Sequence, residues 1–165
     1  MKRLLVFCVQ RGASIPGVRA LLRLAVRLIA PRQYVGAVGA VVNQDGKVLL
    51  ARHSYRTDFQ WGLPGGWVER GEDPARTVER EIVEELNLNV AVERLLVCGR
   101  VPKLDRSIAP AHIGLAFLCR PIGQEVRTSH EITAVEWIDP LSIPYEIAPF
   151  QARAIAAVLE GTGRG

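Results

Sequence analysis

The residues of this chain that point most clearly to chemistry lie between Arg80 and Leu88, where the sequence reads REIVEELNL. Three carboxylates, those of Glu81, Glu84 and Glu85, fall close enough together to share one face of a helix. Like charges at that spacing repel by about 0.2–0.5 kcal/mol per pair, and a bound cation removes the repulsion. By itself the pattern is compatible with an ordinary solvated helix face or with a site that binds a divalent cation.

The helix that carries these glutamates is predicted from its start and stop signals. Asp73 suits the N-cap and Pro74 the first helical position, while Asn87 tolerates the left-handed conformation of a C-cap. We expect the three glutamates to lie beside the apolar stripe of this helix, at the edge of the core. That stripe consists of Ala75, Val78, Ile82 and Leu86.

The sequence LPGGW, upstream of this helix, is the predicted partner of the acidic cluster. Gly65 and Gly66 let backbone carbonyls approach closely, and Mg²⁺ takes one or two carboxylates completed by waters and substrate phosphates. Arg80, one turn before Glu84, is placed to orient and partly neutralise the glutamates. Without the glycines, we would predict an ordinary exposed ion pair between Arg80 and Glu84, which contributes under about 1 kcal/mol to stability. With them, the pattern predicts a metal–phosphate site.

The segment from Gly66 to Leu88 resembles the Nudix box, Gx5Ex7REUxEExGU, in which U is aliphatic. Gly66, Glu72 and the run REIVEELNL occupy the required positions, and the one departure is Asn87 in place of a glycine. Because asparagine also accepts positive φ, we expect this departure to affect the cap rather than the chemistry. The resemblance extends over roughly Val35–Glu160 and includes the stretches WGLPGG and HEITAVEWIDP.

This resemblance implies a hydrolase of nucleoside diphosphates linked to another moiety, X, with water attacking a phosphorus of the pyrophosphate. It implies Glu84 and Glu85 as the main ligands of Mg²⁺ or Mn²⁺, and Glu81 as a ligand or the general base. The carbonyl of Gly65 or Gly66 would complete the metal shell.

Three further residues take roles by resemblance. Arg80 would hold the glutamates, and Glu72 would support the geometry between loop and helix. Glu131 is the candidate for a further catalytic carboxylate, with an ordinary solvated glutamate as the alternative.

The substrate class is predicted from weaker signals. Pro102 stands near the offset of a proline found in ADP-ribose hydrolases of this family, which favours ADP-ribose or a nucleotide sugar. The patterns of coenzyme A and diadenosine polyphosphate hydrolases are not visible. The alternative is a Nudix-fold module that binds a nucleotide or regulates without cleavage, but such modules usually lose the glutamates that this chain keeps.

The histidines and tryptophans carry less information. The three histidines have no ligand spacing, and we expect polar strand-end or loop residues at His53, His112 and His130. Trp61 and Trp67 flank the glycine bend, where either could stack on a base, although packing in the core or at its rim is the expected role.

The remaining pattern predicts a mixed α/β domain over residues 34–165, which with the resemblance indicates a Nudix-like α/β/α sandwich with a mixed β-sheet. Strands over 35–42 and 47–53 are expected to form a hairpin through the turn at 43–46. Further strands are predicted near 90–101, 112–120 and 133–138, with a proline-bearing loop over 102–110 and a closing helix over 149–160.

Residues 1–33 are predicted to form a separate basic extension with an amphipathic helix. Residues 1–44 contain seven basic and no acidic residues, so the net charge of +4 says little about nucleic acid. An arginine stripe marks residues 16–30, which would pack on the domain, form a homodimer contact or lie on an anionic membrane. The segment also resembles an organelle transit peptide without its usual serine richness. The apolar run at 4–9 is too short to span a bilayer.

The three cysteines, Cys8, Cys98 and Cys119, are scattered and odd in number. They predict buried or half-buried free thiols in a reducing cytoplasm rather than disulfides or a metal site.

Overall fold

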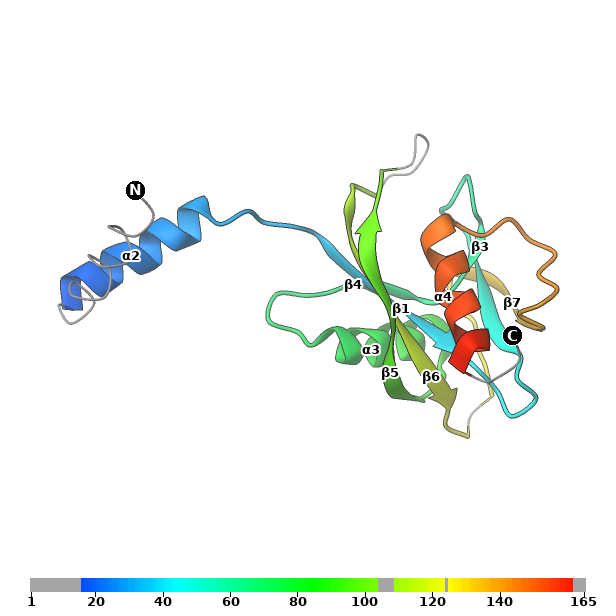
Figure 1. The fold of residues 1–165 in the computed structure, drawn as a ribbon. Helices are drawn as coiled ribbons and strands as arrows, with labels where there is room; N and C mark the ends of the chain where they lie inside the picture. Colours follow the sequence, from blue (N-terminus) through cyan, green and yellow to red (C-terminus); the bar gives the residue numbers. More distant parts are fainter. Residues whose placement is uncertain (1–15, 104–108, 124, 162–165) are drawn as a thin grey trace. The chain divides into compact units, whose positions relative to one another are not determined.

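The computed structural model describes residues 16–103, 109–123 and 125–161. The chain divides into two units at the boundary between Arg32 and Gln33. The first unit contains helix α2 (Pro16–Ile29), within one residue of the predicted helix (Figure 1). Of the elements in the described residues, the second unit contains all the strands and the other two helices.

The second unit is built on two sheets. The larger has the strand order β4 (Gly65–Trp67), β1 (Val35–Val41), β6 (His112–Pro121) and β5 (Val90–Val101). It is mixed, because β1 runs parallel to β6 whereas the other neighbours are antiparallel. The smaller sheet is antiparallel, with the order β3 (Trp61–Gly62), β2 (Val48–His53) and β7 (Ile132–Ile138).

The hairpin expected from the first two strands is wrong, although its turn forms. The Gly46 N–H donates to the Asn43 carbonyl (3.1 Å), and the Lys47 N–H donates to Asn43 Oδ1 (2.9 Å). Beyond the turn, β1 and β2 are joined only by the bridge between Val42 and Val48. The reason is that β4 and β6 already pair with the two edges of β1, so β2 enters the other sheet.

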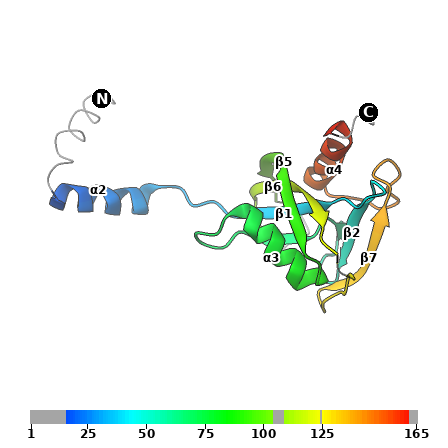
Figure 2. The ribbon, with the colours of Figure 1, turned by 90° about the horizontal axis from the view of Figure 1, so that it is seen from below.

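Helices α3 (Pro74–Leu86) and α4 (Pro149–Gly161) lie on different sides of the strands (Figure 2). Alternate residues of β1 and β2 face each helix, since successive side chains of a strand point to opposite faces. One core cluster joins α3 to Ala37, Val41, Leu49 and Ala51. The other joins α4 to Ala40, Val42, Val48 and Leu50. The predicted α/β/α sandwich with a mixed sheet is therefore confirmed.

Helix α3 begins and ends at the predicted residues. Asp73 Oδ1 accepts a hydrogen bond from the Ala75 N–H (2.8 Å), and Pro74 follows as the first helical residue. Asn87 has φ 51° and ψ 31°, and its N–H donates to the Val83 carbonyl (2.9 Å). Asparagine thus provides the left-handed cap for which the motif normally uses glycine.

The other predicted elements are observed within one residue, but some predictions fall outside the described residues. These are the apolar run at 4–9, Cys8 and the centre of the loop over 102–110. In the part of the chain that the structure describes, no helix is long and apolar enough to cross a membrane.

The two described cysteines are free and lie in contrasting environments. The predicted burial is wrong for Cys98, which is exposed on β5. Cys119 is fully buried, and burial raises the pKa of its thiol to about 12. In a Cys8→Ser background, we expect one thiol to react rapidly with Ellman's reagent and the second only after unfolding in guanidinium. Adding Cys98→Ser should remove the rapid phase; a rapid phase that persists would contradict the burial of Cys119.

Candidate active site

The glycine bend packs directly on the acidic helix, as expected. Gly65 has φ 141°, and a Cβ at this position would overlap the carbonyl oxygen of Ala37. A Cβ at Gly66 would overlap the carboxylate of Glu81. The Gly65 N–H donates to Glu85 Oε2 at 3.0 Å. Both glycines are therefore needed for the backbone to lie this close to the two carboxylates.

The three glutamates of α3 lie in three different environments. The side chain of Glu85 is 6% exposed, that of Glu81 is 19% exposed and that of Glu84 is 60% exposed. Burial raises the pKa of Glu85 to about 7 and also raises the pKa of Glu81. Two of the three carboxylates are therefore held where the charged form is costly.

The prediction that Glu84 lies beside the apolar stripe is wrong. At about 100° per residue, Glu84 falls nearly opposite Ile82 and Leu86, which are both fully buried. Glu84 is consequently the solvent-facing member of the cluster.

Arg80 joins the exposed and half-buried parts of the cluster. Its Nη1 donates to Glu81 Oε1 (2.9 Å) and to Glu84 Oε2 (3.4 Å), while its Nε donates to Glu72 Oε1 (3.0 Å). Its Nη2 also reaches the carbonyl of Trp67 (3.4 Å). One guanidinium thus holds two glutamates of the helix and the end of β4 in a fixed arrangement.

Glu72 has a full set of partners of its own. Its carboxylate accepts hydrogen bonds from Arg80, from Thr77 Oγ1 (2.7 Å) and from the Glu69 N–H (3.1 Å). These hydrogen bonds, led by the one from Arg80, lower the pKa of Glu72 to about 2. The residue ties the loop before α3 to the helix, and this geometry suits a supporting role rather than a ligand role.

His53 is a site residue that sequence reasoning missed. It ends β2, as a strand-end residue should, but it is 1% exposed and its Nδ1 lies 3.7 Å from Glu85 Oε1. Neither ring nitrogen has a hydrogen-bond partner in the described part of the protein. Burial, followed by the charge of Arg56, lowers the pKa of His53 to about 3, so the imidazole is neutral.

A signal for this burial was present in the strand pattern. Leu49 and Ala51 belong to the cluster under α3, and His53 continues the same alternation by one further step. A histidine in that phase is directed towards the interior on the side of the acidic helix.

Residues from two loops complete the edge of the site. The Tyr55 ring packs edge-on against His53 (5.6 Å between centroids), and the guanidinium of Arg56 lies 5.9 Å from the Tyr55 ring. Arg56 lowers the pKa of Glu85 by charge, whereas Glu131 raises it, so both lie within electrostatic reach of that carboxylate. The Ser54 N–H donates to the Glu131 carbonyl (2.9 Å), so Glu131 lies near the end of β2, but its side chain is 52% exposed. Arg56 is a further charged residue that the sequence analysis did not single out.

The two tryptophans beside the glycine bend take packing roles. Trp61 stacks on Tyr145, with 4.2 Å between ring centroids and 10° between planes. Trp67 is 42% exposed and meets Tyr34 and His112 edge-on.

The donor set fits a divalent cation shared with a substrate. In residues 16–103, 109–123 and 125–161, no three His, Cys, Asp or Glu side chains come together closely enough to hold a metal by themselves. The buried Glu85 and the half-buried Glu81 still present two carboxylates whose charged form is disfavoured by burial. Mg²⁺ commonly binds through one or two carboxylates, with waters and phosphate oxygens as its other ligands.

Comparison with known proteins agrees with this geometry. A sequence model of the NUDIX domain matches residues 32–158, a range that contains the glycine bend, α3 and Glu131. This chain belongs to the Nudix hydrolase family. The segment from Gly66 to Leu88 is therefore its Nudix box, with Asn87 as the C-cap of the helix.

Several Nudix relatives resemble the chain over most of its length. A MutT-like protein of Streptomyces ambofaciens is 35% identical over 133 residues, which cover 81% of each chain. An ADP-ribose pyrophosphatase of Methanocaldococcus jannaschii is 33% identical over 110 residues, covering 66% of this chain and 63% of the relative. The crystal structure of a MutT NUDIX hydrolase from Burkholderia pseudomallei superposes with a TM-score of 0.65 and 28% identity, covering 78% of this chain and 99% of that chain.

The contact between Gly66 and Glu81 generates a stability prediction. We expect Gly66→Ala to lower the free energy of unfolding by about 1–3 kcal/mol, because the new Cβ must displace the carboxylate or the strand. Gly99→Ala is the matched control: its Cβ would meet only Arg153 Nη1 at 3.7 Å, and we expect a neutral or slightly stabilising effect. Equal urea midpoints for the two variants would contradict the close approach.

Proposed function

We propose that this Nudix hydrolase cleaves the pyrophosphate bond of a nucleoside diphosphate linked to another moiety, with Mg²⁺ or Mn²⁺ as cofactor. The observation that carries the proposal is the pair of carboxylates of Glu85, which is buried, and Glu81, which is half-buried, packed against Gly65 and Gly66. A solvated acidic face would leave these carboxylates in water. Their burial beside a close-packed backbone instead supports a site that receives a cation together with a diphosphate.

In this proposal, the cation would be held by Glu81, Glu84 and Glu85, with the carbonyl of Gly66 as a further ligand. When bound, such an ion would stabilise negative charge on the phosphates and acidify a water molecule. Glu84 would need little rearrangement to take part, because it is exposed and its bond to Arg80 is long at 3.4 Å.

The protein's own groups would position the reacting atoms. The Gly65 N–H fixes one oxygen of Glu85, and Arg80 fixes one oxygen of Glu81. Water would form a bond to one phosphorus of the pyrophosphate, the bridging P–O bond would break, and its electron pair would leave with the departing phosphate. Glu81, with Glu131 as the further candidate, would accept the proton from the water.

The favoured substrates are ADP-ribose and nucleotide sugars. The support is Pro102, which follows directly after β5, and the relative from Methanocaldococcus jannaschii, whose name is ADP-ribose pyrophosphatase. The charge of Arg56 acts on Glu85, and its guanidinium would bind a phosphate of the substrate. The free thiols at Cys98 and Cys119 suit a reducing compartment, and we place the enzyme in the cytoplasm.

The decisive experiment is a substrate panel with Mg²⁺ or Mn²⁺ and phosphate analysis of the products. ADP-ribose, a UDP-sugar, a nucleoside triphosphate and a dinucleoside polyphosphate would separate the substrate classes. We expect Glu85→Gln to lower kcat by at least about a hundredfold, since it removes a charge that holds the metal. Glu160→Gln, at an exposed position near the end of α4, is the matched control and should keep the wild-type rate.

Two outcomes would count against the proposal. Binding of a panel compound without turnover would favour a nucleotide-binding or regulatory module. A near wild-type rate for Glu85→Gln would refute the assignment of that carboxylate.

His53 provides a second test, because its contribution to activity and to stability should differ. A buried imidazole without partners costs about 1–3 kcal/mol, so His53→Leu should leave the free energy of unfolding unchanged or raise it. If the neutral imidazole orients Glu85 in the loaded enzyme, kcat should fall about tenfold or more, as is usual for residues behind a metal ligand. His53→Asn, which keeps a donor, should recover part of the rate. A wild-type kcat in His53→Leu would assign this residue to packing alone.

A further inference from the structure

Helix α2 has two faces of opposite character. Arg19, Arg23 and Arg27 recur every four residues and form one narrow stripe. Apolar residues cover the rest of the helix, about 240° of its circumference at 100° per residue. No acidic residue occurs in this helix or anywhere in residues 1–44.

The apolar face of α2 is exposed to an unusual degree. The residues of this helix with more than half of their surface exposed include Leu21 (66%), Leu24 (53%), Val26 (65%), Leu28 (73%) and Ile29 (79%). Scattered exposed leucines are ordinary on a protein surface, but a continuous apolar face of this kind marks an interaction site.

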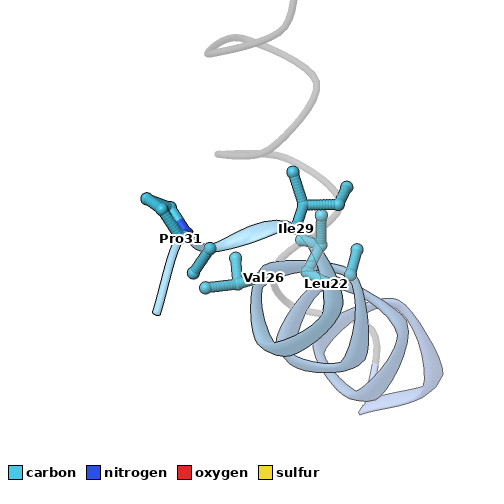
Figure 3. Close-up of a pocket in the computed structure, with 6 residues that line it drawn as sticks. Leu22, Val26, Ile29 and Pro31 are labelled. Atoms are coloured by element: carbon cyan, nitrogen blue, oxygen red, sulfur yellow. The ribbon is translucent and has the colours of Figure 1, made fainter. Parts of the chain in front are cut away.

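The same face carries an open apolar groove of about 360 Å³ near the end of the helix (Figure 3). It is lined by Leu22, Ala25, Val26, Ile29, Ala30 and Pro31, without a charged side chain. Figure 3 shows Leu22, Val26 and Ile29 projecting from the helix with Pro31 beside them. The groove thus offers further apolar surface for insertion into a nonpolar phase.

We propose that α2 binds the surface of an anionic membrane, with its apolar face in the acyl boundary and its arginines among the lipid phosphates. Charge complementarity favours this occupant: a helix with three arginines and no acidic residue in its own sequence suits a negatively charged headgroup layer. With 14 residues, the helix is about 21 Å long and cannot span a hydrocarbon core of about 30 Å. It therefore lies in the membrane interface. Membrane binding would set where the hydrolase acts, and the catalytic site does not need it.

The test is co-sedimentation of the full chain with vesicles of phosphatidylcholine alone and of phosphatidylcholine with 40% phosphatidylglycerol. We expect binding only to the anionic vesicles, with weaker binding as the salt concentration rises. Each arginine near an anionic surface contributes about fivefold to partitioning, so Arg19→Gln/Arg23→Gln/Arg27→Gln should lower the partition coefficient about a hundredfold. The matched control replaces three exposed arginines of the second unit, Arg94→Gln/Arg100→Gln/Arg153→Gln. This variant should bind the vesicles as the wild type does.

A second variant tests the apolar face while keeping the charge. Leu21→Gln/Leu24→Gln/Leu28→Gln should also abolish vesicle binding, and its hydrolase activity in free solution should stay at the wild-type level. Binding that survives this variant would show that charge alone acts, as for a nucleic-acid partner, and would overturn the proposal.

Two results would assign the apolar face to another occupant and overturn the proposal as well. In the first, the wild-type chain does not bind vesicles but forms a dimer by light scattering, and the leucine variant is a monomer. The second is absence of vesicle binding together with a lower Tm in that variant, which would indicate packing of the helix on its own chain.

Discussion

The close packing of α3 on the Gly65–Gly66 backbone is the constraint on which the candidate active site depends. A side chain at either glycine would collide with a neighbour: Ala37 in one case and the carboxylate of Glu81 in the other. Because the backbone can come this close, its N–H reaches Glu85, and two acidic side chains are drawn out of water. The same packing closes the core under α3, where Val78, Ile82 and Leu86 are fully buried.

The acidic cluster is held in two different ways. Arg80 neutralises its outer part through Glu72, Glu81 and Glu84, and it also fixes the end of β4. No arginine hydrogen-bonds to Glu85 among the described residues; one backbone N–H and the distant charge of Arg56 are its favourable partners. The inner carboxylate is therefore the one for which a cation would make the larger difference, since burial opposes its charged form.

The two units of the chain divide its charge in a way that matches the two proposed tasks. Arg19, Arg23 and Arg27 lie on a helix with an exposed apolar face, whereas every acidic residue of the sequence follows Gln33. An acidic catalytic site needs a cation before it can accept a diphosphate, but a basic helix attracts anionic surfaces directly. If both proposals hold, affinity for a surface and affinity for a substrate would reside in different units of the chain.

What the sequence determined by itself was local. The ends of α3 depend on Asp73, Pro74 and Asn87, whose preferences act over one turn of helix, and the spacing of the box follows from that helix and the glycine bend. The outward position of Glu84 could also have been predicted from the sequence, because it follows from the rotation of about 100° per residue in a helix.

The tertiary structure decided the features that depend on distant neighbours. β2 joins a different sheet from β1 because β4 and β6 already pair with both edges of β1, and strand pairing is a choice among all available edges. The burial of His53 beside Glu85 and the approach of Arg56 and Glu131 follow from that arrangement. Side chains far apart in the sequence share an environment only after the sheets and helices have packed, so no local pattern contains that information.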